Sequence, residues 1–368
     1  MKIPYVNLSA SWKEEKKKLI PIINNVFSKG DFVGGDEIEK FEKNVARLCR
    51  TRYAVAFNSG TDALTIGLIL LGVKKNDEVI TPPNSFISST TSIWHIGAKP
   101  IFVDVLDDQN INPNLIKKAI TKKTKAIMPV HLTGKVCNMD EILSISKKYG
   151  IPIIEDAAQS IGSKFRGKMS GSFGEIGCFS THPLKNLNAC GDGGFLTTNN
   201  KNYYLKAKKM RNHGLEDRNI VKNFGFISRM DTIQAAILNF RMKNLKNVIA
   251  QRRVNAKLYL QHLNKNFYEL PYENKNQFNT YHTFVIKCKN REKLIKYLKI
   301  NGIGTAIHYP IPIHLQPAAK FLGHRLGSFP MTENHAKRIL TIPIHQNIKK
   351  NEINKIIYLL NKFAGENL

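Results

Sequence analysis

Apolar and polar residues alternate along residues 40–200 in a pattern that switches repeatedly between two periods. Residues 41–49 place apolar side chains at helical spacing, whereas residues 53–57 form a short apolar run typical of a buried strand. Runs of these two kinds follow one another up to a strand at residues 151–157 and two more strands beyond it. Strands separated by amphipathic helices indicate βαβ units. We therefore expect a mostly parallel sheet with helices on both faces and ligands beyond the carboxyl ends of its strands.

The pattern changes after residue 200, where long, highly charged helices are predicted. Residues 203–212 and 231–263 predict one short helix and one very long one, and a smaller α/β unit follows, up to a last helix at residues 353–363. We expect a large domain over residues 1–245, including an N-terminal arm, and a smaller C-terminal α/β domain over residues 246–368. Two domains also suit a chain of 368 residues, which is long for one hydrophobic core.

The composition is typical of a soluble enzyme from a reducing compartment. Apolar residues make up 42% and charged residues 23% of the chain, and no uncharged apolar run is long enough to span a bilayer. The first residues lack the apolar segment of a secretory signal. The five cysteines are scattered without a CxxC pair, which argues against a zinc site or a disulfide framework. We expect a cytoplasmic protein with no membrane contact and no bound metal.

A formal net charge of +28 is the most unusual bulk property, and by itself it points to a nucleic-acid binder. The lysines, however, are spread along the whole chain and are not gathered with stacking aromatic residues on one segment. A lysine-rich surface that reflects compositional bias is the better interpretation, so we expect no nucleic-acid partner. Such a surface can still attract an anionic substrate.

Two acidic residues, Glu155 and Asp156, stand where an apolar strand ends. An ionised carboxylate in such a buried place needs a cationic partner. A protonated pyridine nitrogen is one such partner, and pairing with a carboxylate keeps a pyridine ring protonated and strongly electron-withdrawing. Alternatively, Asp156 caps a helix that starts just after it.

A loop rich in small residues follows, and its Lys185 stands 29 positions after Asp156. It carries Ser180, His182 and Lys185, and then a glycine cluster that lets the backbone bend sharply and approach a ligand closely. A lysine held in such a pocket loses its proton through desolvation and can attack an aldehyde to form an imine. In a chain with this many lysines, the alternative is that Lys185 is a solvated surface residue.

Residues 57–67 run from a strand directly into a helix through Ser59, Gly60 and Thr61. Backbone N–H groups and the positive end of the helix dipole suit a phosphate group there, although Ser59 or Thr61 can also simply cap the helix. Farther along, Phe86 follows a strand and either offers a flat face on which a ring can stack or belongs to the core.

Taken together and in this order, these segments resemble the DegT/StrS-type sugar aminotransferases, which are fold-type-I pyridoxal-phosphate (PLP) enzymes. The similarity covers nearly the whole chain, and it is specific for the family but not for the substrate. The segments that carry it are IPYVNL, FVGGDEIEKFE, FNSGTDAL, DEVITPPNSFISS, GAKPIFVDV, MPVHLTG, IEDAAQSIG, GCFSTHPLKNLNACGDGG, RNHG, SRMDTIQAAIL, YHTFVI and IHYPIPIHLQPA.

The resemblance implies an α/β fold with a large, mostly parallel seven-stranded sheet domain and a smaller C-terminal α/β domain. It implies that Lys185 holds PLP as a Schiff base and moves a proton between the two imine carbons, and that Asp156 pairs with the pyridine nitrogen. The other implied cofactor contacts are Ser59, Gly60, Thr61 and Ser180 at the phosphate, Phe86 stacked on the ring, and Gln159 near the phenolic oxygen.

For the reaction, the resemblance implies transfer of an amino group from an amino acid, L-glutamate, to a nucleotide-linked keto-sugar in amino-sugar biosynthesis for cell-surface polysaccharide. It also implies a homodimer whose two subunits share their active sites. The implied substrate contacts are His182, Arg229, His308, Tyr309 and His314.

One position departs from the family pattern. Ile227 stands where the family has an asparagine that reaches the cofactor phosphate of the other subunit, and an isoleucine side chain cannot donate a hydrogen bond. The departure puts this cross-subunit contact in doubt but not the chemistry. Either Ser228 or Arg229 replaces the contact, or this subgroup does without it.

Three other hypotheses stay open. A PLP-dependent sugar dehydratase of the same family would carry a histidine in place of the lysine, so Lys185 disfavours it. A keto-acid sugar such as an oxidised octulosonate is an alternative substrate. A regulatory or nucleic-acid-binding protein would use the charge of +28, but no helix-turn-helix or stacking-aromatic motif supports this hypothesis.

Overall fold

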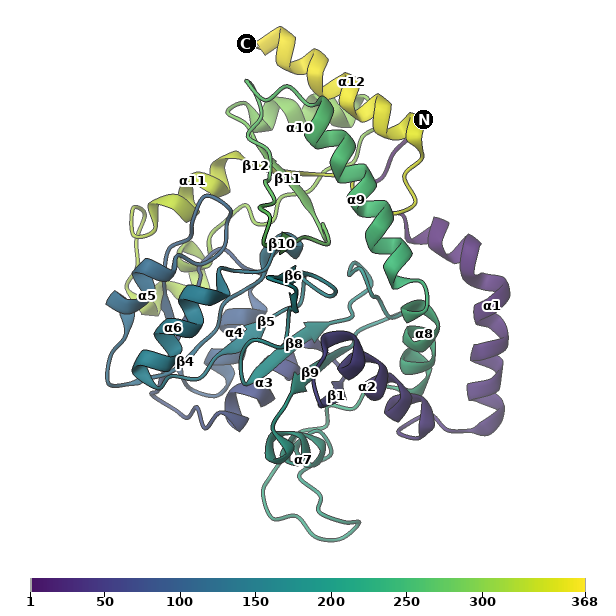
Figure 1. The fold of residues 1–368 in the computed structure, drawn as a ribbon, viewed down its shortest axis with the longest axis vertical. Coiled ribbons are helices and arrows are strands. Elements are labelled where there is room, and N and C mark those ends of the chain that lie inside the picture. Colours follow the sequence, from purple (N-terminus) through teal and green to yellow (C-terminus); the bar gives the residue numbers. More distant parts are fainter. Residues whose placement is uncertain (1, 368) are drawn as a thin grey trace.

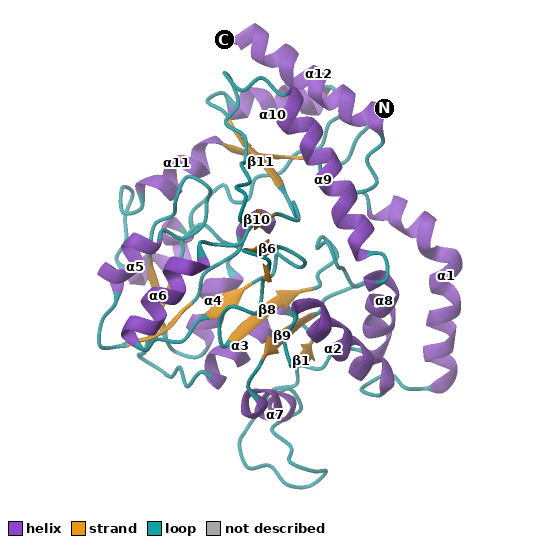
Figure 2. Ribbon diagram, in the orientation of Figure 1, coloured by secondary structure: helices purple, strands orange, loops and turns teal. Residues whose placement is uncertain are grey.

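The computed structural model describes residues 2–367 as a sheet-based body with a smaller C-terminal part above it in the view of Figure 1. We use "the C-terminal part" for residues 263–367. Both labelled chain ends lie on this part, and Figure 2 shows helices on both sides of the strands of the body. None of the helices within residues 2–367 is long and apolar enough to cross a membrane.

The body is built around seven strands within the described residues: β1 (Tyr53–Phe57), β2 (Glu78–Thr81), β3 (Lys99–Phe102), β4 (Thr124–Ile127), β5 (Ile154–Asp156), β8 (Ile176–Ser180) and β9 (Gly194–Thr198). Two groups of paired strands, β3–β2–β4 and β5–β8–β9–β1, are joined by parallel bridges from Ile127 to Ile153 and from Val130 to Asp156. Only β9 runs against the others, because its pairings with β8 and β1 are antiparallel and all other pairings are parallel. The expected mostly parallel α/β sheet is therefore confirmed.

Helices cover both faces of this sheet. They are α2 (Asp36–Cys49), α3 (Gly60–Leu70), α4 (Ser88–His95), α5 (Pro113–Ala119), α6 (Met139–Tyr149), α7 (Lys201–Met210) and α8 (Thr232–Met242). Strand β1 shows why both faces need a cover. Its Ala56 packs in one hydrophobic cluster with Phe41 of α2. The next residue, Phe57, packs in a different cluster with Leu64 of α3, because successive residues of a strand point to opposite faces.

The C-terminal part has a hydrophobic cluster of its own. Helix α9 (Leu245–His262) leads into it, and an antiparallel pair of strands, β11 (Phe284–Lys287) and β12 (Ile339–Ile342), packs with α10 (Arg291–Ile300) and α12 (Lys350–Asn367). Ile3 belongs to the same cluster and pairs with Ile303, so the N-terminal segment packs on the C-terminal part. The boundary at residue 245 stays a prediction.

The remaining elements lie at the edges of this arrangement. Helix α1 (Leu8–Lys29) packs on α8 at the right of Figure 1. The others are α11 (Pro330–Arg338), the short strands β6 (Lys164–Phe165), β7 (Lys168–Met169) and β10 (Gln277–Phe278), and the 3₁₀ helices η1 (Leu132–Gly134), η2 (Ile313–Leu315) and η3 (Pro317–Leu322).

The prediction of one very long helix over residues 231–263 is wrong. Two helices form, α8 and α9, and Lys243 and Asn244 separate them. The N–H groups of these two residues bond to carbonyls only three positions back, which tightens the last turn of α8 and ends the regular helix. The break leaves α8 on the sheet, and it lets α9 reach the C-terminal cluster through Tyr259.

Candidate active site

A cavity of about 260 Å³ lies at the carboxyl ends of the parallel strands, under residues of the C-terminal part. Parallel strands deliver the loops that follow them to the same edge of a sheet, so segments far apart in the sequence meet there. The residues expected at the site that line this cavity are Ser59, Gly60, Thr61, Phe86, Asp156, Gln159, Ser180, His182, Lys185, His308 and Tyr309.

Lys185 lies in the loop after β8 and lines the cavity. The loop turns sharply, since the N–H of Lys185 donates to the carbonyl of His182 over 2.8 Å. The neighbouring Asn186 is buried and donates its side-chain N–H to the carbonyl of Thr280 over 3.2 Å, which ties the loop to the C-terminal part. Burial lowers the pKa of Lys185 to about 8, although the negative charge of Asp156 acts in the opposite direction. A substantial fraction of this amine is therefore neutral and nucleophilic at slightly alkaline pH.

Asp156 ends β5 and lines the same cavity. Its Oδ2 accepts a hydrogen bond from the Ser89 hydroxyl over 2.6 Å, and its Oδ1 accepts one from the N–H of Ala158 over 3.1 Å. The second contact is a local turn, and no helix begins within residues 157–170. The alternative that Asp156 caps a following helix is therefore wrong, and its carboxylate is held at the cavity wall.

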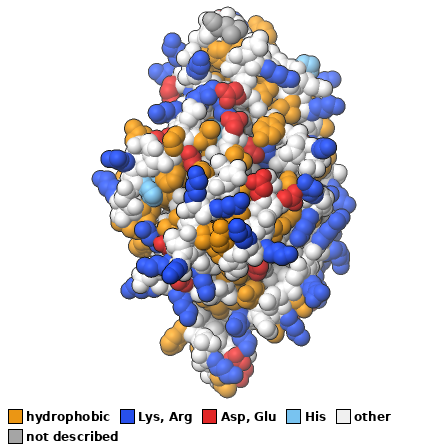
Figure 3. Space-filling view, turned by 60° about the vertical axis from the view of Figure 1, so that its left-hand side comes forward, with side chains coloured by type: hydrophobic (Ala, Val, Ile, Leu, Met, Phe, Trp, Pro, Cys, Tyr) orange, Lys and Arg blue, Asp and Glu red, His pale blue; other side chains and the backbone are white. Residues whose placement is uncertain are grey.

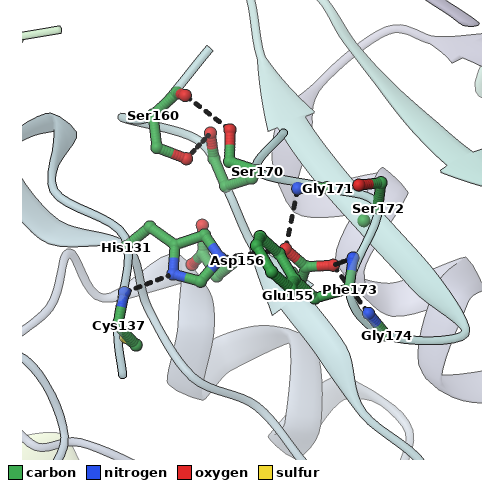
Figure 4. A network of polar contacts seen from close by, with 12 residues as sticks. His131, Cys137, Glu155, Asp156, Ser160, Ser170, Gly171, Ser172, Phe173 and Gly174 are labelled. Atoms are coloured by element: carbon green, nitrogen blue, oxygen red, sulfur yellow. Dashed lines mark hydrogen bonds and ion pairs between the residues drawn. The ribbon is translucent and has the colours of Figure 1, made fainter. Parts of the chain in front are cut away.

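Glu155 does not line the cavity, because neighbouring residues of a strand face opposite sides, and Figure 4 shows its carboxylate directed at the loop 171–174. Its carboxylate accepts backbone N–H bonds of 2.6 to 2.8 Å from three residues of the loop 171–174. One oxygen also lies 2.9 Å from Nε2 of His131, whose Nδ1 accepts the N–H of Cys137 over 3.2 Å. The ring proton of His131 is therefore on Nε2 and is donated to Glu155. Glu155 thus anchors a loop and takes no part in the cavity.

The N-terminus of α3 opens onto the cavity. The helix-capping role that the sequence allows for Ser59 is confirmed, because its hydroxyl accepts the N–H of Asp62 over 3.1 Å. Ser59 also lines the cavity. Gly60 packs so closely on Ser180 that a side-chain carbon on it would lie 2.8 Å from the Ser180 Cβ. The first N–H groups of the helix, together with the hydroxyls of Thr61 and Ser180, form a place suited to a phosphate.

His308 and Tyr309 from the C-terminal part line the cavity from the other side. The Tyr309 hydroxyl accepts a 3.3 Å hydrogen bond from the side-chain N–H of Gln159, and the Tyr309 ring centroid lies 5.9 Å from that of Phe86. Phe86 is 55% exposed, so it belongs to the cavity wall and not to the core. Burial and the positive charge of Lys185 lower the pKa of His308 to about 4, and its imidazole is therefore neutral near pH 7.

Two further residues line the cavity that sequence reasoning did not single out. His282 is 9% exposed, and its Nδ1 has no hydrogen-bond partner among the described residues. Burial lowers the pKa of His282 well below its ordinary value, and the positive charge of Lys185 adds to the effect. Tyr5 packs its ring 5.7 Å from that of His308. The only signals for them were the segments YHTFVI and IPYVNL, which carried part of the family resemblance.

Two residues expected to contact the substrate do not line this cavity. His314 is buried, and its Nε2 lies 3.0 Å from a carboxylate oxygen of Glu333. Arg229 donates to the side chain of Asn212 over 3.3 Å. Within this chain, the structure therefore groups neither residue with Lys185.

The segment around the family departure lies on the surface of the chain. Ile227 is 61% exposed and pairs through its backbone with Asn212. Ser228, in contrast, is buried and donates its hydroxyl to the side chain of Asn58 over 3.0 Å. Because Ser228 is bonded inside its own chain, it is a poor candidate to replace the missing asparagine.

The groups that line the cavity fit PLP. An amine with a lowered pKa suits the cofactor aldehyde, a carboxylate suits its pyridine nitrogen, and a helix N-terminus suits its phosphate. Phe86 adds an exposed aromatic face beside them.

Nearly the whole chain is similar to known proteins. Residues 13–361 match the DegT/DnrJ/EryC1/StrS aminotransferase family. A pleiotropic regulatory protein of Geobacillus stearothermophilus is 35% identical over 367 residues, covering 99% of this chain and 99% of the relative. The dTDP-3-amino-3,4,6-trideoxy-alpha-D-glucose transaminase of Streptomyces venezuelae is 33% identical and covers 99% of this chain and 96% of its own.

A solved structure agrees with this assignment. Streptomyces venezuelae DesV in complex with a ketimine intermediate matches this fold with a TM-score of 0.96 at 33% identity, covering 99% of this chain and 98% of DesV. The predicted family, fold, enzyme class and cofactor are thereby confirmed. This protein belongs to the DegT/DnrJ/EryC1/StrS aminotransferase family and is a PLP-dependent sugar aminotransferase.

Proposed function

We propose that this enzyme transfers an amino group from L-glutamate to a nucleotide-linked keto-sugar, in amino-sugar biosynthesis for a cell-surface polysaccharide. The observation that carries the proposal is that Lys185, Asp156 and the N-terminus of α3 line a single cavity. They come from three separate segments, and together they complement the aldehyde, ring nitrogen and phosphate of one cofactor. The dTDP-sugar transaminase of Streptomyces venezuelae supports the choice of a nucleotide-linked substrate.

In this proposal, Nζ of Lys185 holds the cofactor covalently and then carries the proton that moves between the donor carbon and the cofactor. When bound, PLP supplies an electron-withdrawing ring that stabilises the negative charge next to the transferred nitrogen. Asp156 keeps the ring nitrogen protonated. The remaining proposed contacts are Phe86 on the ring face, Gln159 near the phenolic oxygen, and Ser59, Gly60, Thr61 and Ser180 around the phosphate.

Histidine and tyrosine side chains line the substrate side of the cavity. We assign contacts with the sugar hydroxyls to His182, His308 and Tyr309, together with His282. Lys185 is the only lysine or arginine among the residues of the described chain that line the cavity. The cations that bind the glutamate carboxylate and the nucleotide phosphates must therefore come from the cavity rim or from a second subunit. Figure 3 shows Lys and Arg side chains spread over the surface.

We also infer a homodimer. Phe224 is 97% exposed and Ile227 is 61% exposed. Phe32 and Val33 are each 53% exposed, and Val33 pairs through its backbone with Asp231, four residues after Ile227. Exposed apolar side chains in neighbouring segments are typical of a protein interface. Analytical ultracentrifugation tests this inference, and a monomer at micromolar concentration would contradict it.

A half-reaction screen tests the proposed function. The enzyme is first converted to its pyridoxamine form with L-glutamate, and candidate keto-sugars are then added while the absorption spectrum of the PLP form is followed. We expect nucleotide-linked 3-keto or 4-keto sugars to restore that spectrum. Recovery with a keto-acid sugar such as an oxidised octulosonate alone would transfer the assignment to that substrate.

Two other outcomes would overturn the proposal. Loss of a sugar hydroxyl without amine transfer would show a dehydratase, although Lys185 disfavours one. The absence of any half-reaction, together with a DNA mobility shift that persists at physiological salt, would favour a regulatory protein.

A further inference from the structure

We propose that Ser89 is a positioning residue for Asp156, whose carboxylate it holds in the orientation that leaves free lone pairs for the ring nitrogen of the cofactor. This inference rests on the role proposed for Asp156. It deepens that role, because it explains what directs the carboxylate.

The hydrogen bond between the two residues is short and buried. Ser89 lies in the first turn of α4 and is 1% exposed, and Asp156 is 5% exposed. The Ser89 Oγ lies 2.6 Å from Oδ2 of Asp156 and 3.4 Å from the carbonyl oxygen of Phe86. A hydroxyl has one proton to donate, and it goes to the shorter, charge-assisted contact.

The sheet alone does not orient this carboxylate. The backbone of Asp156 is held by its N–H to the Pro129 carbonyl over 2.9 Å and by its carbonyl to the His131 N–H over 3.0 Å. These bonds leave the side-chain torsions free. Ala158 N–H then holds Oδ1, and Ser89 holds Oδ2. An ionised carboxylate accepts about four hydrogen bonds, so two acceptor positions remain, and Asp156 lines the cavity.

Helix α4 connects this contact with the rest of the site. Phe86, which lines the cavity, comes just before the helix. Ser88 accepts a 3.0 Å hydrogen bond from the Thr61 hydroxyl at the proposed phosphate site, and Ser89 donates its hydroxyl to Asp156. The start of one helix thus contacts all three parts of the site: Phe86 for the cofactor ring, Thr61 for the phosphate and Asp156 for the ring nitrogen.

The variant Ser89→Ala tests the inference, and Ser92→Ala is a matched control. Ser92 lies one turn later in α4, is fully buried, and donates its hydroxyl only to the Ser89 carbonyl, over 3.1 Å. Alanine is a good helix former, so both variants should fold. We expect Ser89→Ala to weaken PLP binding by about tenfold, as measured by titration of the cofactor-free enzyme, because the loss removes one hydrogen bond to a charged group. Ser92→Ala should bind PLP like the wild type.

A second set of measurements separates positioning from packing. In Ser89→Ala, the circular dichroism of the bound cofactor should change and kcat should fall by about tenfold with little change in KM for L-glutamate. Ser89→Cys keeps a similar shape with a poorer donor, and it should fall between alanine and the wild type. In an Asp156→Asn background, Ser89→Ala should change PLP affinity by less than about twofold, because its effect passes through the carboxylate.

The outcomes also distinguish this inference from the proposed function. If Asp156→Asn is impaired while Ser89→Ala keeps wild-type PLP affinity, cofactor dichroism and kcat, the positioning role is wrong and the function of Asp156 stands. An equal tenfold loss from Ser89→Ala in the Asp156→Asn background would also overturn the positioning role. If Asp156→Asn itself behaves like the wild type, the proposed function of that residue fails first.

Discussion

Glu155 and Asp156 are neighbours in the chain, yet their side chains lie on opposite sides of β5. Asp156 lines the cavity and is held by the Ser89 hydroxyl over 2.6 Å. Glu155 instead bonds to the backbone of the loop 171–174 and to His131. The same chemical change, from carboxylate to amide, should therefore affect activity at one position and stability at the other.

For Asp156→Asn we expect a folded protein that loses most of its activity. A neutral amide no longer keeps the ring nitrogen protonated, and losing a charge pair at the reacting centre costs on the order of several kcal/mol of transition-state stabilisation. Steady-state kinetics measure the loss, and thermal unfolding checks that the fold is kept. Near-normal turnover would contradict the proposed pairing with the pyridine nitrogen.

For Glu155→Gln we expect the reverse. The amide group places N–H donors against backbone N–H groups that now donate to the carboxylate, and the free energy of unfolding should fall by about 3 kcal/mol. Denaturant unfolding of the cofactor-free enzyme measures this change. The protein that remains folded should keep its kcat, and a fall in kcat at unchanged stability would show that Glu155 belongs to the site.

Lys185→Ala should abolish transamination and covalent capture of the cofactor. In the wild type, borohydride should fix PLP to Lys185, and mass spectrometry of the digested protein should find the adduct on that residue. Without the amine, the rate should fall by at least about a thousandfold, because the group that is proposed to move the proton is lost. An adduct on a different lysine would show that the site has been assigned to the wrong residue.

The lowered pKa of Lys185 makes a prediction about pH. Because burial brings this pKa to about 8, the neutral amine becomes the major form as the pH rises through 8, and its reactivity should level off above that point. Lysines with an ordinary pKa should continue to gain reactivity toward pH 10. Labelling the cofactor-free enzyme with an amine reagent at several pH values, followed by mass spectrometry, compares both kinds in one sample. A curve for Lys185 that keeps rising past pH 10 would contradict its burial.

Phosphate binding should depend mainly on groups of the same subunit. We expect Thr61→Ala combined with Ser180→Ala to weaken PLP binding clearly, by about tenfold or more, since two hydroxyl groups are removed from the proposed phosphate site. Ile227→Asn should leave the affinity unchanged or tighten it, because it adds an amide donor in a segment that is exposed in the single chain. Titration of the cofactor-free enzyme measures both, and the dimer should persist in each variant. Strong weakening by Ile227→Asn would show that this segment packs elsewhere.

Much of the fold and the centre of the site could be predicted from local patterns. The alternation of strands and amphipathic helices indicated the mostly parallel sheet, because hydrophobic periodicity reports which face of each element is buried. Lys185 and the start of α3 stand out as candidates for a similar reason, and the family resemblance implies the roles expected of them. A strand that runs into a glycine-rich loop, or directly into a helix, has a local signature in the sequence.

Tertiary structure alone decided which side chains share the cavity. The pairing of β5 with its neighbours sends Asp156 to one face and Glu155 to the other, and a shift of one residue would exchange them. Packing of the C-terminal part brings His282 to the cavity and leaves His314 outside it. The break between α8 and α9 likewise goes with long-range packing, because α8 packs on the sheet and α9 reaches the hydrophobic cluster of the C-terminal part. Contacts between residues far apart in the chain have no local period, so the sequence determined the elements and the candidate chemistry, and the folded core determined how they are combined.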